Sequence, residues 1–447
     1  MKTDELFSEH SNVGETVKPP HHTHFGFPER WREESLGGLS GASSGTINPL
    51  DFPNELFEYY SIPAFQEQNA PILERGSAIF SIKLLVENGT VLFGKLNPRV
   101  LKVWLVDSES PNRRIASTEF LPIVSNGLAE PKFVYFMCHS DIVVSEARRL
   151  VSGSTPSRQR VDPSAFYEIL IPLPPLDEQR TIARTLDAVR NTIEARRHEL
   201  RLERERKAAL MDYLFTHGAL GEPTKQTEIG KMPESWKLTT LGELCNNGLG
   251  SIQTGPFGSQ LHAADYVQSG IPVVNPTHLL FNGIETDRLP KINKELADAL
   301  SRHYLFEGDI LISRRGDFSR YAYIGSKEAG WLCGTGCLLV RLANPAVENY
   351  FLAISMSLEP IQNYLKDAAV GSIMPNLNTR ILSRMPVIVP HIEEQRRIAE
   401  VVRSCEAKIR ALEEEEPLRD ELFNAMLEEL MSGRLSAVPL LEEQSTK

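Results

Sequence analysis

The sequence predicts an α/β (mixed α+β) protein of two tandem globular domains, separated by two long helices that form an antiparallel coiled coil. First, 447 residues are more than one hydrophobic core usually accommodates. Second, short motifs of the first half recur in the same order in the second half. Third, each half ends in a long stretch with apolar residues at helical spacing.

The repeat begins with a motif around a tryptophan. Residues 28–39 (PERWREESLGGL) and 233–244 (PESWKLTTLGEL) share a proline, a glutamate, the tryptophan, two leucines and a glycine, each 205 positions apart. Residues 171–180 are echoed in the same way by 385–396. A period near 200 residues indicates a duplicated domain, because solenoid repeats are about 20–50 residues long. Chance similarity of turn motifs is the alternative, and the shared order of the matches disfavours it.

The domain boundaries follow from these motifs and from composition. Short β-rich runs lie between Gly, Pro and Asn residues inside each globular part, with occasional helical stretches. The predicted segments are an N-terminal tail (1–25), a first domain (26–175), a central helix (176–218), a linker (219–230), a second domain (231–390), a C-terminal helix (391–436) and a tail (437–447).

The two helices carry apolar residues spaced alternately by three and four. Such a seam predicts that the helices pack on each other, and the alternative is that each lies on its own domain. The same register also contains charged residues, among them Glu203 and Lys207. Pro417 should break or kink the second helix, because proline lacks a backbone donor. The seam residues are Ile182, Leu186, Val189, Ile193, Leu200, Ile398, Val402, Ile409 and Leu412.

Composition excludes several classes of protein. With 41% hydrophobic residues and no apolar run near the roughly 18 residues of a membrane span, a cytoplasmic protein without a membrane partner is expected. The five cysteines are scattered, so no disulfide framework is expected. The net charge of 48 − 59 = −11 leaves nucleic-acid binding undecided, because phosphate contact depends on local basic surface.

Motifs for catalysis are missing. No phosphate-binding glycine loop is present, and Asn97-Pro98 and Asn344-Pro345 lack the second proline and aromatic residue of amino-group DNA methyltransferases. Cys333 and Cys337 could supply half of a zinc site, but two buried thiols fit the pattern better. The sequence therefore predicts no catalytic residue, no metal site and no cofactor on this chain.

Polar and basic loops follow apolar strands at matching places in both halves. Arg and Lys can bind phosphate or guanine, and Asn or Gln can pair with adenine. A solvated surface loop is the alternative for any single residue, and the recurrence in both halves favours binding. The candidate DNA-binding residues are Lys95, Asn97, Arg99, Arg158, Arg160, Ser259, Gln260, Arg314, Arg315, Asn376, Asn378 and Arg380.

Several of these strings resemble one known family. Residues 227–236 followed by 241–244 are similar to the opening of a target-recognition domain in the specificity (S) subunits of type I restriction–modification systems. Residues 174–180 and 390–396 resemble the starts of that family's spacer helices. The resemblance extends from about residue 25 to about 435, and Pro417 and His391 depart from the usual pattern.

The resemblance implies a function that the residues alone do not. Each domain would read one half of a split, asymmetric site in double-stranded DNA. Two methyltransferase (M) subunits and the restriction/translocase (R) subunits would bind to the chain, and S-adenosylmethionine, ATP and Mg would belong to those partners. Two rival hypotheses are a coiled-coil scaffold that binds no DNA and a solitary DNA-modifying enzyme.

Overall fold

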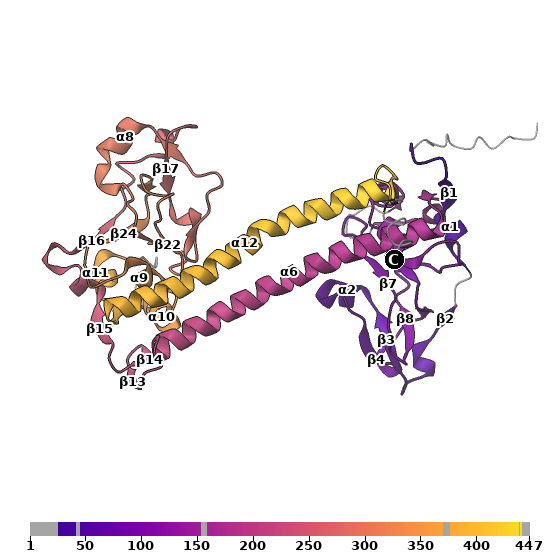
Figure 1. The fold of residues 1–447 in the computed structure, drawn as a ribbon, viewed down its shortest axis with the longest axis horizontal. Helices are drawn as coiled ribbons and strands as arrows, with labels where there is room; N and C mark the ends of the chain where they lie inside the picture. The colour runs from indigo at the N-terminus through magenta and orange to yellow at the C-terminus, as the bar shows by residue number, and fades with distance from the viewer. Residues whose placement is uncertain (1–25, 42–44, 153–158, 370–375, 438, 440–447) are drawn as a thin grey trace, which may run out of the picture. The chain divides into compact units, whose positions relative to one another are not determined.

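The structure is a computed structural model that describes residues 26–41, 45–152, 159–369, 376–437 and 439. It divides into two compact units (Figure 1). Unit 1 comprises residues 1–196 and 415–447, and unit 2 comprises residues 197–414. Each unit therefore contains one globular domain together with a segment of each long helix.

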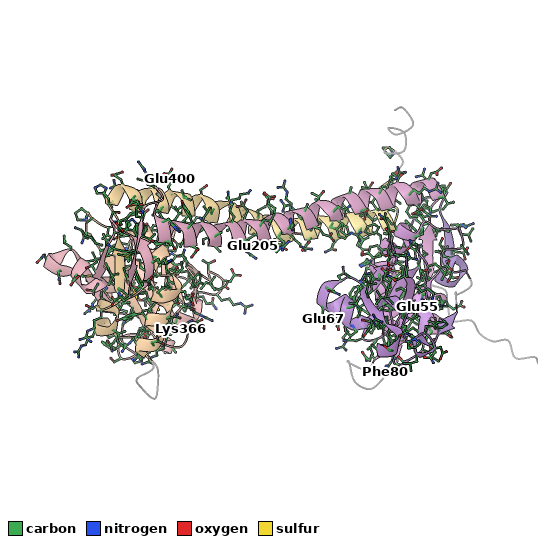
Figure 2. All side chains as sticks on the ribbon, turned by 90° about the horizontal axis from the view of Figure 1, so that it is seen from below. Glu55, Glu67, Phe80, Glu205, Lys366 and Glu400 are labelled. Carbon is green, nitrogen blue, oxygen red and sulfur yellow. The ribbon has the colours of Figure 1, made fainter. Side chains whose placement is uncertain are left out.

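The two larger sheets of unit 1 share no strand, and β1-β12 and β10-β11 form two further two-stranded sheets. A five-stranded sheet has the order β2-β5-β8-β3-β4, and a three-stranded sheet has the order β7-β6-β9. Figure 2 labels Glu55 and Phe80 at the end of this unit that lies away from its helix segment. The strands are β1 (Arg32–Ser35), β2 (Thr46–Ile47), β3 (Leu56–Tyr60), β4 (Ile72–Arg75), β5 (Lys83–Leu85), β6 (Val91–Gly94), β7 (Val103–Leu105), β8 (Arg113–Ala116), β9 (Phe120–Ile123), β10 (Val151–Ser152), β11 (Arg160–Val161) and β12 (Leu170–Leu173). The helices are α1 (Leu36–Leu39), α2 (Ile62–Gln68), α3 (Pro131–Met137), α4 (Asp141–Arg149), α5 (Pro163–Tyr167) and the start of α6 (Leu176–His217).

Unit 2 repeats part of this plan and varies the rest. A four-stranded sheet has the order β16-β24-β21-β22, and a three-stranded sheet has the order β20-β17-β23. The strands are β13 (Thr224–Thr227), β14 (Gly230–Pro233), β15 (Lys237–Thr240), β16 (Gly250–Thr254), β17 (Ile271–Val274), β18 (Leu279–Leu280), β19 (Gly283–Ile284), β20 (Lys291–Ile292), β21 (Ile310–Ser313), β22 (Tyr321–Tyr323), β23 (Leu332–Cys333), β24 (Cys337–Leu342) and β25 (Pro386–Val389). The helices are α7 (Leu241–Leu244), α8 (Lys294–Ala299), α9 (Asn349–Ser355), α10 (Glu359–Ala369), α11 (Thr379–Ser383) and α12 (Ile392–Met431), whose last part belongs to unit 1.

The expectation that the two long helices pack together is confirmed within each unit. In unit 1, Ile182 and Leu186 of α6 share a core with Leu427 and Leu430 of α12. In unit 2, Leu200 forms a cluster with Ile409 and Leu412. The helices also lie on the globular domains. The core of unit 1 includes residues of its sheets, and in unit 2 Ile398 and Val402 of α12 share a second core with Ile388 of β25. Both alternatives for the seam are therefore realised. Of the other expected seam residues, Ile193, Ile398 and Val402 are buried, whereas Val189 is half-buried.

Ion pairs occupy the charged positions of the seam in unit 2. The Nζ atom of Lys408 lies 2.6 Å from Oε1 of Glu203, and Nζ of Lys207 lies 2.6 Å from Oε1 of Glu406. Their order along the two helices is antiparallel. The hydrogen bond from Lys408 lowers the pKa of Glu203, and the pKa of Lys408 is raised by its hydrogen bonds to Glu203 and Glu199. Residues outside the seam, such as Glu205 and Glu400, are exposed (Figure 2).

Two features differ from the expectations. The proposed linker contributes to a hairpin, since β13 pairs antiparallel with β14. Of the two effects expected of Pro417, a break or a kink, the break is wrong, because α12 continues through this residue. A proline removes only its own backbone donor, and buried residues of α12 anchor the helix on each side of this position.

Glycines end both long helices in the same way. Gly218 after α6 and Gly433 after α12 have φ values of +72° and +71°, a conformation that favours glycine. A Cβ atom on Gly433 would lie 2.6 Å from Cδ of Pro28, and one on Gly218 would lie 3.3 Å from Cγ of Pro233. The end of each helix therefore contacts the tryptophan motif of one repeat. Across the described ranges, no helix is long and apolar enough to cross a membrane.

Candidate nucleic-acid interface

The first candidate loop begins where β6 ends. β6 is completely buried and pairs with β7 and β9, so the 95–102 loop is fixed at both ends. The backbone N–H of Lys95 donates to the carbonyl oxygen of Glu119 at 2.9 Å, and the Lys95 carbonyl accepts from Val161 N–H at 3.0 Å. The fold thus brings Lys95, Asn97 and Arg99 beside Arg160, about 60 residues further along the chain.

A buried lysine stabilises this loop by donating hydrogen bonds to its backbone. The Nζ atom of Lys102, a residue that is 3% exposed, donates to the carbonyl oxygens of Val100 (2.7 Å), Leu96 (3.0 Å) and Asn97 (3.3 Å). Burial lowers the pKa of this ammonium group, which forms no ion pair with any described carboxylate. Three carbonyl groups therefore converge on one cation and fix the path of the loop.

The candidate side chains in this loop are not equivalent. Asn97 has a φ of +48°, and its Oδ1 atom is buried with no hydrogen-bond partner among the described residues. Lys95 is half-buried, and Arg99 is exposed. Arg160 forms a two-bond pair with Glu119 (3.1 and 3.2 Å), so a phosphate would have to compete with that carboxylate. Arg158 lies outside the described residues.

Unit 2 builds its loop with the same backbone hydrogen bonds. The N–H of Arg314, directly after β21, donates to the carbonyl oxygen of Gly336 at 2.9 Å, and its own carbonyl accepts from Leu377 N–H at 3.0 Å. An isolated bridge joins Arg315 to Asn376, as another joins Leu96 to Arg160 in unit 1. Lys95 therefore corresponds to Arg314, and Arg160 corresponds to Asn376.

The correspondence continues through the following helix. The side chain of Asp162 accepts from Ala165 N–H at the start of α5, and that of Asn378 accepts from Ile381 N–H at the start of α11. Asn378 therefore caps a helix, which engages its Oδ1 atom. Arg380, on α11, is exposed and has no described partner.

The helix starts are anchored alike. The Nε2 atoms of Gln179 and Gln395 donate to the carbonyl oxygens of Pro174 (2.8 Å) and Pro390 (2.9 Å). The indole N–H of Trp31 donates to Glu178 (3.1 Å), as that of Trp236 does to Glu394 (3.0 Å). The repeated sequence motifs thus encode equivalent anchoring contacts.

The two arginines after β21 have different environments. Arg314 is half-buried, and its Nε atom donates to the carbonyl oxygen of Leu377 at 3.1 Å. Arg315 is exposed, and its side chain has no partner among the described residues. The nearby carboxylate of Asp317 accepts hydrogen bonds from Ser319 Oγ and Arg320 Nε.

The glycine-rich loop after β16 reaches the same end of the sheet. The N–H of Gly255 donates to the carbonyl oxygen of Cys337 at 2.9 Å, and Cys337 also pairs with Ser313, the last residue of β21. A Cβ atom on Gly255 would lie 2.1 Å from the carbonyl oxygen of Gly334, so only glycine fits. Ser259 and Gln260 are exposed in this loop, and Gln260 Oε1 accepts from Phe257 N–H.

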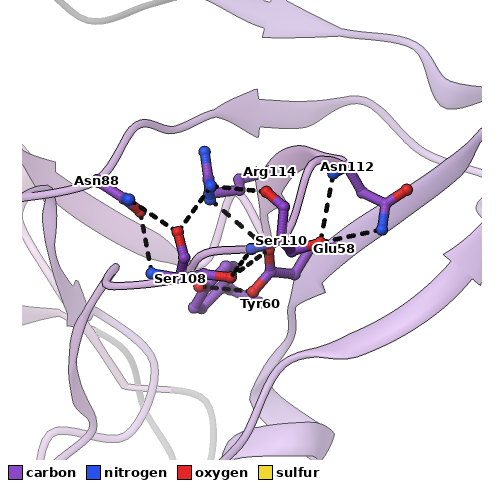
Figure 3. Close-up of polar contacts among 7 residues, drawn as sticks. All are labelled: Glu58, Tyr60, Asn88, Ser108, Ser110, Asn112 and Arg114. Atoms are coloured by element: carbon purple, nitrogen blue, oxygen red, sulfur yellow. Dashed lines mark hydrogen bonds and ion pairs between the residues drawn. The ribbon is translucent and has the colours of Figure 1, made fainter.

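A buried polar cluster stiffens the five-stranded sheet of unit 1 (Figure 3). Glu58 is 4% exposed and accepts from the Tyr60 hydroxyl (3.0 Å) and from Ser108 Oγ (2.9 Å), while Arg114 Nε lies 3.6 Å from its carboxylate. Burial and this carboxylate raise the pKa of Tyr60. Neither this cluster nor the role of Lys102 was predicted from the sequence, because only the fold brings their partners together.

The two cysteines that could have bound a metal are buried thiols, as expected. Cys337 Sγ lies 3.4 Å from the carbonyl oxygen of Val274, and burial raises the pKa of Cys337. Among the residues described, no group of three or more His, Cys, Asp or Glu side chains is placed to hold a metal ion.

Comparison with known proteins identifies the class. The profile of the type I restriction modification DNA specificity domain matches residues 28–204 and again 233–419. The chain therefore belongs to this family and contains its domain twice, in agreement with the repeated hydrogen bonds. Within type I restriction–modification systems it corresponds to the specificity subunit, which is the non-catalytic component.

Individual relatives are distant. The chain is 24% identical over 284 residues to the specificity subunit of type I restriction enzyme MjaVIII of Methanocaldococcus jannaschii, a match that covers 62% of this chain and 64% of that protein. It is 24% identical over 462 residues to the EcoDI specificity subunit of Escherichia coli, covering 93% and 95%. The match therefore spans slightly less than two thirds of the MjaVIII subunit.

Solved structures share the fold. The type I S subunit of M. genitalium superposes with a TM-score of 0.57 at 16% identity, covering 93% of this chain and 98% of that one. A chain from a type I restriction–modification structure described in terms of complex assembly and conformational transition gives a TM-score of 0.51 at 23% identity, covering 92% and 99%.

Proposed function

We propose that this chain reads a bipartite, asymmetric DNA site, with one half-site recognised by each unit, and that it recruits methyltransferase and restriction subunits to that site. The observation that carries the proposal is the matched loop construction. Lys95 and Arg314 occupy equivalent positions with the same backbone hydrogen bonds. The side chains that follow them differ, so the two loops offer different donors on one scaffold.

Electrostatics supports DNA contact despite the net charge of −11. Lys95 and Arg99 in unit 1, and Arg315 and Arg380 in unit 2, have no ion-pair partner among the described residues. Unpaired cations next to rigid strand ends can bind phosphates and base edges with little loss of conformational entropy. A coiled-coil scaffold without DNA would not require two such loops.

The partners supply the chemistry in this proposal. Two methyltransferase subunits and the restriction/translocase subunits bring S-adenosylmethionine, ATP and Mg. The chain contributes DNA recognition together with surfaces on the helices α6 and α12.

A domain exchange tests the proposal. Residues 26–175 are replaced by the first domain of another specificity subunit, the complex is assembled with its methyltransferase subunits, and the methylated sequence is determined. We expect one half of the methylated motif to change and the other to stay. A change in both halves, or in neither, would refute independent reading by the two units. The reciprocal exchange of residues 231–390 is the matched control and should change the other half.

A further inference from the structure

A second group of basic residues lies in unit 2 beside the β20-β17-β23 sheet, apart from the loops described above. A cavity of about 430 Å³ opens beside the β20-β17-β23 sheet. Its lining combines three basic side chains with one tryptophan and one carboxylate. The lining residues are Pro272, Thr286, Arg288, Leu289, Lys291, Lys327, Glu328 and Trp331.

The three cations of this cavity are not neutralised by ion pairs within the described ranges. Arg288 and Lys327 are exposed, Lys291 is half-buried, and none of the three forms an ion pair with a described residue. The one lining carboxylate, Glu328, accepts from the backbone N–H of Gly325 at 3.1 Å. In unit 2, by contrast, Arg341 is paired with Asp309 at 2.6 Å.

The backbone holds two of these cations in place. Lys291 lies on β20 and pairs with Pro272 of β17. Arg288 has a φ of +65°, in the left-handed region that is unfavourable for a residue with a Cβ atom. The segment is tied down immediately afterwards, because the carbonyl oxygen of Pro290 accepts from Val273 N–H at 2.8 Å. Backbone strain of this kind is concentrated at ligand sites.

Trp331 gives the cavity a flat apolar wall. It is half-buried, packs against the core around Val274 and Leu311, and its carbonyl oxygen accepts from Leu305 N–H at 2.8 Å. An indole beside several cations suits a sugar-phosphate chain, because the ring contacts the sugar while the cations bind the phosphate.

The cavity and the candidate DNA-binding loops are joined by one short strand. Trp331 directly precedes β23, and Gly334 directly follows it, three residues after Trp331. Gly334 contacts the loop after β16. Three residues of extended chain span about 10 Å. At about 3.4 Å per base step, this corresponds to roughly three steps of one DNA strand.

We propose that Arg288, Lys291 and Lys327 bind a backbone phosphodiester of DNA next to the half-site read by unit 2. This inference rests on the proposed function and adds a phosphate contact that carries no sequence information. The acidic residues Glu285 and Asp287 precede Arg288, but neither lines the cavity. The contact would raise affinity for all sequences and fix the register of unit 2 on the duplex.

The first test compares two sets of substitutions in the complex assembled with its methyltransferase subunits. The triple variant Arg288→Gln, Lys291→Gln, Lys327→Gln should bind specific and unrelated duplexes more weakly by a similar factor. The slope of the logarithm of its binding constant against the logarithm of salt concentration should become shallower. The change should be about one unit for each phosphate that the variant no longer binds. The methylated motif should remain unchanged.

The matched control removes three exposed lysines of unit 2 that do not line the cavity, as Lys231→Gln, Lys237→Gln, Lys294→Gln. Equal affinity and salt dependence in the two triple variants would overturn the inference. Failure of the proposed function has a different result, because the wild-type complex would then bind no DNA at all. The two failures are therefore distinguishable. The single variant Lys327→Gln, at an exposed position, serves if the triple variant does not fold.

The second test uses Trp331 as a local probe in the full chain. The other tryptophans, Trp31, Trp104 and Trp236, are buried, so acrylamide should quench mainly Trp331. A duplex of about two helical turns should protect this fluorescence in the wild type and not in the triple variant. Protection by inorganic phosphate to the same extent as by DNA would assign the cavity to a free phosphate compound and overturn the backbone assignment.

Discussion

The ammonium group of Lys102 lies 2.7 Å from the carbonyl oxygen of Val100. Its other two acceptors are also backbone carbonyls of the same loop, so one buried side chain determines where Lys95, Asn97 and Arg99 point. In the second repeat the matching position is Arg320, whose carbonyl accepts from Ser313 N–H as that of Lys102 accepts from Gly94 N–H. Arg320 instead pairs with Asp317 at 3.4 Å.

Replacing Lys102 by Met should relax the reading of one half-site only. The substitution leaves three carbonyl groups without their donor, which costs about 1–3 kcal/mol of stability and loosens the loop. We expect degenerate bases in the half-motif read by unit 1 and an unchanged second half. Sequencing of the methylated sites checks this.

The control for Lys102 is Lys83→Met. Lys83 is another buried lysine of unit 1, 5% exposed, whose Nζ atom donates to the carbonyl oxygen of Ser81. Lys83→Met should destabilise unit 1 by a similar amount and leave the methylated DNA motif unchanged. Relaxation in both variants would mean that general destabilisation, and not loop position, causes the effect.

Arg315→Ala should weaken DNA binding without destabilising unit 2, because the Arg315 side chain is exposed and unpaired among the described residues. If Arg315 binds guanine, its removal should cost about 1–3 kcal/mol on the specific site alone. If it binds phosphate, the salt dependence should become about one unit shallower on every sequence. Titrations at two salt concentrations separate these cases.

Arg314→Ala is the companion variant. Because Arg314 Nε donates to Leu377 O, this change should also lower the stability of unit 2 by about 1 kcal/mol. Wild-type affinity and salt dependence in both variants would exclude this loop from the interface.

The ion pair between Glu203 and Lys408 should make the stability of unit 2 depend on pH at both extremes. The pKa of Glu203 is lowered, so its contribution is present above the ordinary carboxyl range near 4.5 and is lost as the pH falls through the lowered value. The pKa of Lys408 is raised, so its contribution is present below 10.5 and is lost as the pH rises through the raised value. Lys408→Met should lower the unfolding temperature near neutral pH and have little effect in strong acid, where Glu203 is protonated. An equal effect under the two conditions would contradict this, and Lys294→Met is the control.

His139 should make unit 1 less stable in weak acid. Burial lowers its pKa to about 4, while the unfolded chain takes up a proton near 6.5. The unfolded state therefore binds more protons between these values, and stability should fall as the pH is lowered, by up to about 1.4 kcal/mol per pH unit. Urea denaturation across this pH range measures the slope, which His139→Gln should reduce.

A matched control for His139 is the exposed residue His391. His391→Gln is the reference variant for the effect of the substitution itself. His303, in unit 2, also has a pKa lowered by burial to about 4, so the pH dependence of unit 2 should remain in the His139 variant. A full wild-type slope in His139→Gln would refute the assignment.

The sequence by itself determined the duplication, the mixed α+β class and the pairing of the long helices. These depend on local motifs and on periodic burial, which are visible in the order of residues. Trp31 and Trp236, for example, make the same contact with the glutamate that starts each long helix. Of the break or kink expected at Pro417, the break does not occur, because tertiary packing on both sides outweighs the loss of one backbone donor.

The tertiary structure alone decided which candidate residues lie together and which are free. Arg160 and Arg315 look alike in sequence, but the first is paired with Glu119 and the second is unpaired among the described residues. No sequence pattern marks Lys102 as the residue that holds the loop, because its three acceptors are backbone carbonyls, which every residue has. The physical reason is that charge and hydrogen bonding act over a few ångströms in space, and only the folded chain sets those distances.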